Sequence, residues 1–516
     1  MPRNLTEIDR ILGTDPRFGS ADTIDARNTA RFRVGLRILA GRHPRHATEF
    51  GRVGRLPTAG LRRLLCDPVL HNAFERDLAV ALSRPSEPST LALMLRQAGS
   101  AKDALGPCEG LMESHHQPWP ALGPAWVWTS TLPEEAHPLL TALGRRRDDV
   151  FEEMGVTRRV EPDGEALAAL SRGAELLAEL LPHTGAGALR HVALVGFAEG
   201  EDEDGSVHSF ACGDRLPSAL FLSPHALTDP WKAAELLFHE SLHLKMFDIM
   251  RTGALVSDIG RMTGIPPWRV VDWNLRRVYS SLHVYAHMVL FFAAAAAAPA
   301  ELRRRYGEPP ARESVGACTP GSVAAAEGTY ATSEERTRYL ACQALHAHGD
   351  ALTSDGRAMV VRLLDAVAPL VPGLPPTDRS PEHATERVTA SAPDPAAVPH
   401  PGGYHQRRPI TVLPLQDQGT LLAVAPGSSR MVWLNAHAWF VFSLCDGRDL
   451  RALEAAYLRK APGGLSGLGG ALEALLSAGL IAPTGTPPPA TVTVPATTPT
   501  TAPAAAGSRA TEGAAR

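Results

Sequence analysis

Two proline- and alanine-rich stretches, at 370–404 and 483–516, constrain the fold of this 516-residue chain more than any other feature. Both contain few large apolar side chains, so neither can bury enough surface to offset the entropy lost on ordering. We expect a disordered linker over 370–404 and a disordered tail over 483–516. The rest of the chain then forms a large N-terminal body and a compact C-terminal module over 405–482.

The overall composition is that of a soluble globular protein with no strong charge bias. Lys and Arg number 51 against 55 Asp and Glu, which disfavours electrostatic capture of nucleic acid or membrane. The six cysteines include no CxxC pair, as expected in a reducing compartment. The N-terminus has no apolar signal segment, and the longest apolar run, from Met288, is too short to span a bilayer. We expect a cytoplasmic protein.

The N-terminal body has mainly helical periodicity, with apolar residues at three- and four-residue steps in segments such as 25–42 and 164–181. The interval 191–223 differs, because short β-branched or alternating runs are separated there by Gly, Asp and Pro. The fold class is therefore predicted to be mainly α, with a small β-sheet before a long helix. We expect a helical region over 1–160 and a metal-binding catalytic domain over 161–369.

That long helix, whose start is marked by Thr228, Asp229 and Pro230, carries the most informative motif of the chain. His239, Glu240 and His243 form an HExxH sequence. Residues four apart lie on one helical face, so both imidazoles can reach one cation, and the glutamate beside them can handle a proton or hold a metal-bound oxygen. The sequence therefore predicts a metal centre on this helix.

A reactive centre of this kind needs a further ligand. The downstream stretch WNLRRVYSSLHVYAHMVLFF offers His283 and His287, one helical turn apart, and the residues alone leave both open. The HExxHxxGxxH extension of one peptidase class is absent, and no nearby glutamate has the helical setting of the thermolysin-like peptidases. These absences weaken the interpretation of the chain as a simple zinc peptidase, which remains an alternative.

The run LPSALFLSPHALTDPWKAAELLFHESLHLKM, followed by RRVYSSLHVYAHMVL, resembles the HExxH-type 2-oxoglutarate-dependent peptide β-hydroxylases. These are iron enzymes associated with ribosomally made, post-translationally modified peptides, and the resemblance covers about 190–290. It implies that His239 and His243 bind Fe(II), with a zincin-like local arrangement. It also implies that His283 is the third ligand, with His287 a weaker candidate.

The same resemblance implies an arginine that grips the carboxylate of 2-oxoglutarate. Where the family tends to read RPLxGvLH this chain reads RRVYSSLH, so the proline is missing and both Arg276 and Arg277 are candidates. A guanidinium can bind a carboxylate through two parallel hydrogen bonds. Nitrogen and oxygen ligands suit iron and zinc alike, so the ligands alone do not choose the metal. Glu240 would act from outside the coordination sphere or as an alternative ligand.

The C-terminal module has the pattern of a small winged-helix domain. We expect two or three short strands, at 410–415, 421–424 and 431–434, followed by three helices, at 436–444, 449–458 and 468–478. The signature VWLNAHAWFVFSLCDGRDL and the closing LxxLxxAGLI resemble the PqqD-like domains that recognise precursor peptides. The resemblance implies that a leader peptide adds as an edge strand and packs against a helix, with Leu434, Asn435 and Trp439 as candidate contacts.

A nucleic-acid role for this module is disfavoured because acidic residues offset the basic ones on its helices. The two resemblances together predict β-hydroxylation of a ribosomal precursor peptide, with Fe(II), 2-oxoglutarate and O2 as cofactor and cosubstrates. The linker would raise the effective concentration of the core peptide at the metal. The alternatives are a zinc peptidase, with Glu240 as general base, and a non-catalytic peptide-binding adaptor.

Overall fold

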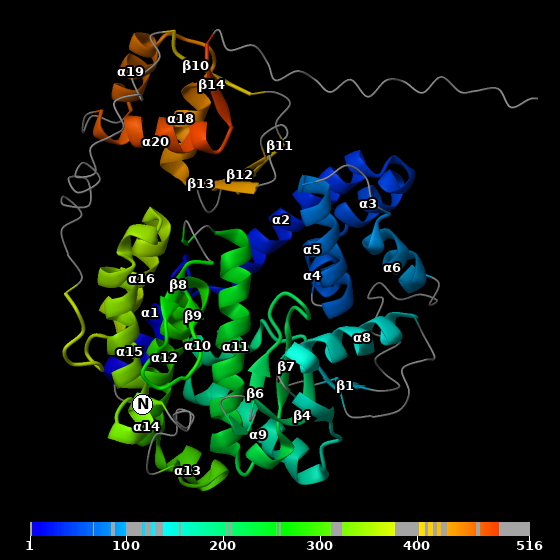
Figure 1. Cartoon of the computed structure of the whole chain (residues 1–516), viewed down its shortest axis with the longest axis vertical. Helices are drawn as coiled ribbons and strands as arrows, with labels where there is room; N and C mark the ends of the chain where they lie inside the picture. The colour runs from blue at the N-terminus through cyan, green and yellow to red at the C-terminus, as the bar shows by residue number, and fades with distance from the viewer. Residues whose placement is uncertain are drawn as a thin grey trace, which may run out of the picture.

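The chain is mainly helical, with small β-sheets (Figure 1). The computed structural model describes residues 3–65, 67–83, 88–99, 116–118, 125–128, 138–153, 156–202, 205–206, 209–253, 255–256, 260–310, 322–376, 402–407, 411–415, 420–424, 431–460 and 465–484. Residues 377–401 of the predicted linker and 485–516 of the predicted tail lie outside this description.

The first part of the chain contributes helices and three short strands. In chain order these are α1 (Arg3–Thr14), α2 (Ala21–Arg42), η1 (Pro44–His46), α3 (Ala47–Gly54), α4 (Thr58–Leu65), α5 (Pro68–Ser83), α6 (Thr90–Gly99), β1 (His116–Pro118), β2 (Trp126–Trp128), α8 (Pro138–Glu153) and β3 (Val156–Arg159).

The middle part carries the predicted metal motif. Its elements are α9 (Gly164–Leu180), α10 (Thr184–Leu189), β4 (Leu194–Asp202), β5 (Gly205–Ser206), β6 (Ser209–Ala211), β7 (Ala219–Leu222), η4 (Pro224–Ala226), α11 (Pro230–Thr252), β8 (Met262–Gly264), β9 (Trp273–Asn274), α12 (Leu275–Ala296), α13 (Ala300–Tyr306), α14 (Val323–Glu327), α15 (Ser333–Cys342), η5 (Gln343–Ala347), η6 (Gly349–Ala351) and α16 (Ser354–Val367).

One seven-stranded sheet lies beside the HExxH helix α11. Its strands follow the order β1-β2-β4-β7-β6, and β3 and β5 also pair with β4. Strand β4 runs parallel to β2 and β7, whereas β6 runs antiparallel to β7 and ends the order. The predicted sheet over 191–223 is confirmed. Strands β1, β2 and β3 come from the region that the sequence predicted to be helical.

The main hydrophobic core continues across residue 160. Phe18 and Val127 from the first part are buried in the same cluster as Leu237 and Leu282 from the helices α11 and α12. Gly173 of α9 lets α11 approach closely, because a Cβ at this glycine would lie 2.6 Å from the Cβ of Ala233. The expected boundary at residue 160 therefore lies inside one packed unit.

The two longest helices of the middle part, α11 and α12, begin at side-chain caps. Asp229 accepts hydrogen bonds from two backbone N–H groups of α11, and Asn274 accepts one from Arg277 of α12. Helix α12 is long and apolar enough to cross a membrane, but 89% of its apolar window is buried inside the protein. Such burial is that of a core helix in a soluble protein, and the chain folds around it.

The C-terminal module consists of β10 (Tyr404–Gln406), β11 (Thr411–Leu415), β12 (Thr420–Val424), β13 (Met431–Leu434), α18 (Ala436–Leu444), α19 (Leu450–Leu458), α20 (Ser466–Ser477) and β14 (Ile481–Pro483). The three central strands follow the order β11-β12-β13, and β10 pairs with β14 to join the ends of the module. The three central strands and the three helices lie within one or two residues of their predicted positions, whereas β10 and β14 were not predicted.

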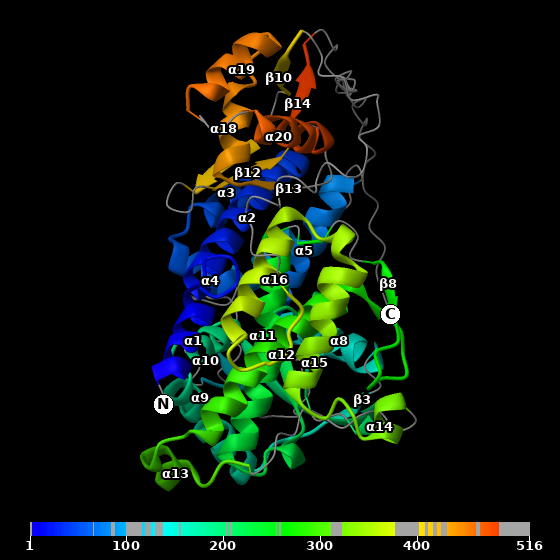
Figure 2. The ribbon, with the colours of Figure 1, turned by 90° about the vertical axis from the view of Figure 1, so that its left-hand side faces the viewer.

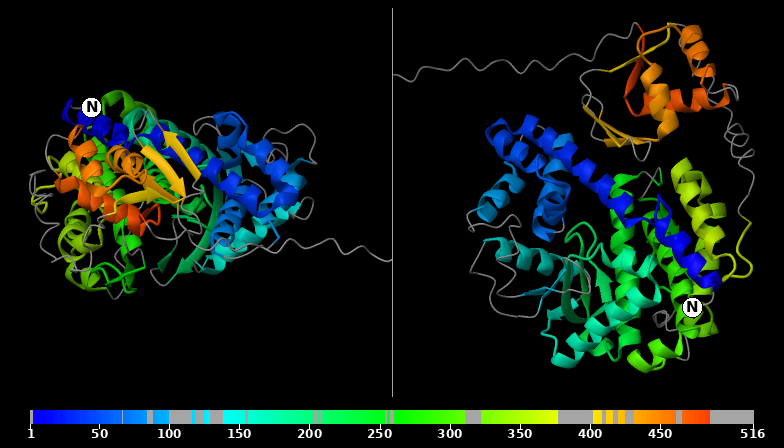
Figure 3. Two further views of the ribbon diagram at one scale, coloured as in Figure 1. Left: turned by 90° about the horizontal axis from the view of Figure 1, so that it is seen from above. Right: turned by 180° about the vertical axis from the view of Figure 1, so that it is seen from behind.

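This module packs against the N-terminal body rather than standing free of it (Figure 2). Val34 of α2, with no exposed surface, shares a buried cluster with Leu422 and Val424 of β12. Helix α2 runs from beneath the module along the body (Figure 3, right), and Asn28 of the same helix donates a hydrogen bond to the Asp248 carbonyl of α11 at 3.2 Å. One helix therefore contacts both the module and the HExxH helix.

Candidate metal centre

The HExxH helix presents His239 and His243 together, with their ring centroids 5.1 Å apart. Both side chains are partly exposed, whereas Glu240 between them is only 4% exposed. Most of the helix is buried on α9, the sheet and α12, so the partly exposed histidines occur on an otherwise packed element. This arrangement gives a solvent-reachable imidazole pair on a rigid support.

Glu240 is held by the strand at the end of the sheet. Its carboxylate accepts a 2.6 Å hydrogen bond from the Ser209 hydroxyl and another from the backbone N–H of Ala211, both on β6. Burial nevertheless raises the pKa of Glu240 to about 7, because the two hydrogen bonds offset only part of the desolvation. A carboxyl group with this pKa exchanges a proton readily near neutral pH.

His243 is oriented from the neighbouring helix α12. Its Nδ1 lies 2.9 Å from the Ser280 hydroxyl, which leaves Nε2 for a metal. Burial, followed by the charge of Arg277, lowers the pKa of His243 to about 4. The ring is therefore neutral at physiological pH, and a neutral imidazole is the form that binds metals.

His239 contacts another residue of α12. Its ring lies 6.0 Å from the ring of Tyr285 at an angle of 75°. Burial lowers the pKa of His239 well below its usual value, with further contributions from His243 and Arg336. Both histidines of the motif are therefore neutral donors for a transition metal.

The predicted third ligand, His283, lies in a different environment. Its ring is 4.4 Å from that of His287, and both rings make edge contacts with Phe18. Both histidines are 0% exposed, and Lys245, which is equally buried, lies near them and donates to the Gly19 carbonyl. The ring of His283 thus contacts that of His287, and among the described residues His283 forms no three-ligand metal group with the HExxH histidines.

The donor atoms at the motif suit a metal ion. His239 and His243 supply two neutral imidazoles, and the Ser280 contact fixes one of them as a second-sphere partner would. Within the part of the chain that the structure describes, no group of three His, Cys, Asp or Glu side chains is arranged to hold a metal. The two motif histidines fit a metal, and a third protein ligand is not assembled with them.

The two candidate arginines differ in their surroundings. Arg276 donates to the Asp214 carboxylate at 3.0 Å and lies over the Phe247 ring. Arg277 is exposed, its guanidinium lies 4.7 Å from the ring centroid of Trp273, and its charge acts on His243. Arg277 is therefore the better placed of the two to meet an anion at the motif.

The three residues of the C-terminal module that the sequence predicts as peptide contacts also contribute to the structure of the module. Leu434 is 4% exposed in the module core, and Trp439 is partly buried against the same core. The Asn435 side chain caps α18 by accepting a 2.8 Å hydrogen bond from the Ala438 N–H. Strand β13, which ends at Leu434, pairs only with β12 among the described strands.

Sequence reasoning missed three residues of the site, namely Ser209, Ser280 and Tyr285. Ser280 occupies the position of the family glycine and could have been found from that departure, whereas the contacts of Ser209 and Tyr285 arise only when distant segments pack together. No protein-family model matches this chain, and no curated protein matches it either.

Proposed function

We propose that this protein is an Fe(II)- and 2-oxoglutarate-dependent hydroxylase of a ribosomal precursor peptide, with His239 and His243 as iron ligands. The observation that carries the proposal is the partly exposed pair of neutral imidazoles beside a buried carboxyl group. Iron with bound 2-oxoglutarate would supply the chemistry that inserts an oxygen atom from O2 into a C–H bond. The sequence resemblance supports this choice of metal, which the donors alone do not fix.

Arg277 and Glu240 would have separate tasks around the metal. Arg277 would bind the distal carboxylate of 2-oxoglutarate, because its side chain is exposed and its charge acts on His243. Glu240, held by Ser209 and Ala211, would hold or move a proton at its carboxylate without being a ligand. His283 remains the third ligand predicted by the resemblance, but its contacts with His287 do not support that role.

A peptide substrate is supported by the position of strand β6. This strand ends the order of the described sheet, and its residues Ser209 and Ala211 contact Glu240. An extended peptide that pairs with a free strand edge presents alternate side chains to one face. A core peptide at this edge would therefore lie beside the metal ligands.

The C-terminal module would bind the leader part of the same peptide as a PqqD-like winged-helix domain. Strand β13 offers an edge for an added strand, and the partly buried Trp439 lies on the following helix. Because Val34 docks the module on α2, the leader would be held at a fixed place on the body. We therefore attribute substrate delivery to a docked module rather than to free tethering.

The test is anaerobic reconstitution of the full chain with Fe(II), followed by addition of 2-oxoglutarate. The proposal predicts a weak visible charge-transfer band, and a precursor peptide encoded beside the gene should gain one oxygen atom with formation of succinate. An Arg277→Ala variant should need far more 2-oxoglutarate to produce the band, whereas Arg45→Ala on the first 3-10 turn is the matched control. Absence of the band at saturating cosubstrate would contradict the proposal.

One observation favours a second candidate, a zinc peptidase. The pKa of Glu240, raised to about 7 by burial, suits a general base acting on a metal-bound water. A peptidase would release a shortened peptide with Zn(II) and form no succinate. Glu240→Gln separates the two, because it should abolish cleavage and leave the 2-oxoglutarate band in place.

A further inference from the structure

The two metal-binding histidines of the motif are each contacted by one residue of α12. Ser280 binds Nδ1 of His243, and Tyr285, five residues later, lies against the ring of His239. Tyr285 is 5% exposed, so its ring cannot move without displacing its neighbours. The contact with His239 is nearly perpendicular, which is a favoured geometry for two aromatic rings.

Tyr285 is in turn fixed by a third helix. Arg336 of α15 donates from Nη1 to the Tyr285 hydroxyl at 2.8 Å and from Nε to the Tyr330 carbonyl at 2.9 Å. Its guanidinium carbon lies 5.2 Å from the Tyr285 ring centroid and 5.3 Å from that of Trp268. Arg336 is 1% exposed and Trp268 is 0% exposed, so the whole assembly is buried.

We propose that Tyr285, fixed by Arg336, is a positioning residue that orients the imidazole of His239 for metal binding. A tyrosine side chain has two torsions that matter, and here the ring contacts restrain one end while the hydroxyl hydrogen bond restrains the other. The fixed ring limits the orientations of His239, as Ser280 does for His243. Groups that orient metal ligands from outside the coordination sphere change metal affinity when they are removed.

This inference rests on the proposed role of His239 as a metal ligand, but not on 2-oxoglutarate or on the peptide. In this account the residue of α12 that contacts His239 is Tyr285, which lies in the sequence between the two predicted ligands His283 and His287. His283 and Tyr285 are two residues, and therefore about 200°, apart around the helix. His283 therefore lies on the side of α12 away from Tyr285, whereas Ser280, three residues before His283, lies on nearly the same side as His283.

The test is a titration of the metal-free full chain with Co(II) alone, followed by visible absorption for both affinity and ligand geometry. Tyr285→Leu should weaken Co(II) binding by about 10- to 100-fold and alter the absorption band. Tyr285→Phe keeps the ring and removes only the hydroxyl, so a smaller effect in the same direction is expected. Thermal unfolding of each variant shows whether the fold is retained.

Tyr279→Phe is the matched control. Tyr279 is also on α12, is 3% exposed, and donates its hydroxyl hydrogen bond to the Ala344 carbonyl at 3.2 Å, away from the motif. Its loss should lower stability and leave Co(II) binding unchanged. Wild-type affinity and spectrum in both Tyr285 variants would overturn the inference.

The outcome also separates this inference from the proposed function. Suppose that the Tyr285 variants bind Co(II) more weakly than the wild type, and that the iron form of the wild type shows no 2-oxoglutarate band. This result would support the positioning role of Tyr285 and contradict the hydroxylase. Failure of the wild-type chain to bind Co(II) would overturn both.

Discussion

Two helices of this protein each carry a pair of histidines four residues apart, and the pairs differ in almost every physical respect. His239 and His243 on α11 are partly exposed and have a buried carboxyl group between them. His283 and His287 on α12 are fully buried, with a lysine as their nearest charged group. Identical spacing therefore says that two imidazoles share a helical face, but not whether that face meets solvent or the core.

The two histidine pairs also differ in their hydrogen bonds. Nδ1 of His243 contacts a serine hydroxyl on another helix, which leaves Nε2 available at the partly exposed face. Nδ1 of His287 instead lies 2.7 Å from the His283 carbonyl of its own helix, while Nε2 of His287 and both nitrogens of His283 have no hydrogen-bond partner. The first pair is the one that we propose as metal ligands, whereas the second pair lies in the core with three buried ring nitrogens that no described group meets.

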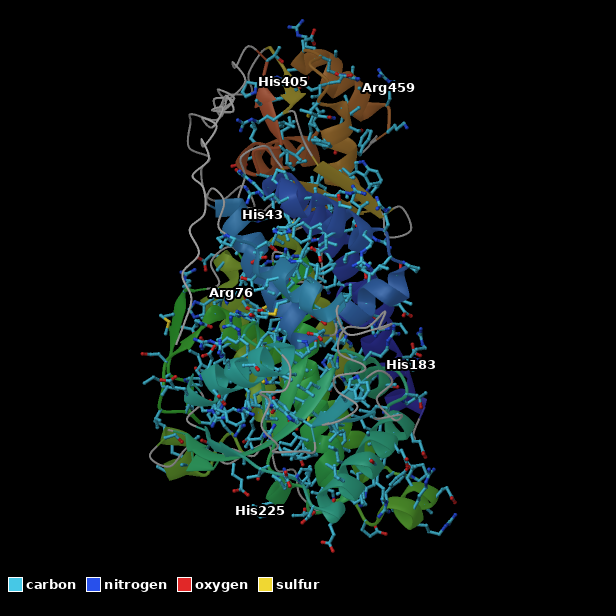
Figure 4. All side chains as sticks on the ribbon, turned by 90° about the vertical axis from the view of Figure 1, so that its right-hand side faces the viewer. His43, Arg76, His183, His225, His405 and Arg459 are labelled. Atoms are coloured by element: carbon cyan, nitrogen blue, oxygen red, sulfur yellow. The ribbon has the colours of Figure 1, made fainter. Side chains whose placement is uncertain are left out.

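The largest expected effect is the loss of metal binding when the α11 pair is broken. His239→Ala or His243→Ala should lower Zn(II) affinity by more than the roughly 10- to 100-fold that is typical of substitutions outside the coordination sphere. Isothermal titration calorimetry measures this change. His225→Ala is the control, because His225 is a surface side chain at the end of the molecule opposite His405 (Figure 4). Equal affinities in all three variants would refute the metal centre.

The second prediction concerns the α12 pair. His283→Ala should lower the free energy of unfolding by about 2–3 kcal/mol, because it leaves a cavity beside Phe18 in the main core. The Zn(II) affinity of the folded protein should stay unchanged. Urea unfolding and calorimetry measure the two quantities. A large loss of affinity with little loss of stability would instead establish His283 as the third ligand that the sequence resemblance implies.

The third prediction is a pH dependence of stability to which the buried His287 contributes. Burial, with the nearby Lys245, lowers the pKa of His287 to about 3, below the 6.5 of an ordinary histidine. Between these values the unfolded chain binds the extra proton, so the contribution of His287 to stability is complete above about pH 6.5 and is lost as the pH is lowered. One such group contributes about 1.4 kcal/mol per pH unit.

Removing His287 should therefore flatten this dependence. Urea midpoints of the metal-free protein between pH 6.5 and pH 4 should fall less steeply in His287→Met than in the wild type, by about one bound proton. Methionine fills a comparable space with a flexible apolar side chain. An unchanged slope would show that His287 does not titrate on unfolding.

The smallest expected effect comes from the partner of His243. Ser280→Ala removes the hydroxyl at Nδ1 and should weaken Zn(II) binding about tenfold, the lower end of the range for such partners. Ser281→Ala removes the neighbouring buried hydroxyl and is the matched control. Calorimetry on both variants decides whether this hydrogen bond orients the ligand, and identical affinities would show that it does not.

Local signals in the sequence predicted local structure well. The cap at Asp229 located the start of α11, and short apolar runs placed β12 and β13 to within one residue. The pairing of strands that lie far apart in the chain was harder to predict from the sequence. Strand β2 is only three residues long and joins the sheet through β4, more than sixty residues later in the chain, so its own periodicity carries almost no signal.

The candidate site shows the same contrast between local features, which the sequence predicted, and long-range contacts, which it did not. The helical period predicted that His239 and His243 share a face, and the sequence of α12 correctly indicated a helix that lies against α11. It did not indicate which residues of α12 contact the motif. That choice depends on how the helices pack, which placed Tyr285 and Ser280 at the motif and His283 beside Phe18.

Anomalous X-ray diffraction from crystals of the full chain grown with Zn(II) tests the central claim most directly, because it locates the metal without reference to activity. The account predicts one strong peak at α11, about 2.0–2.1 Å from ring nitrogens of both His239 and His243. A peak between His283 and His287, with none at the HExxH pair, would contradict it.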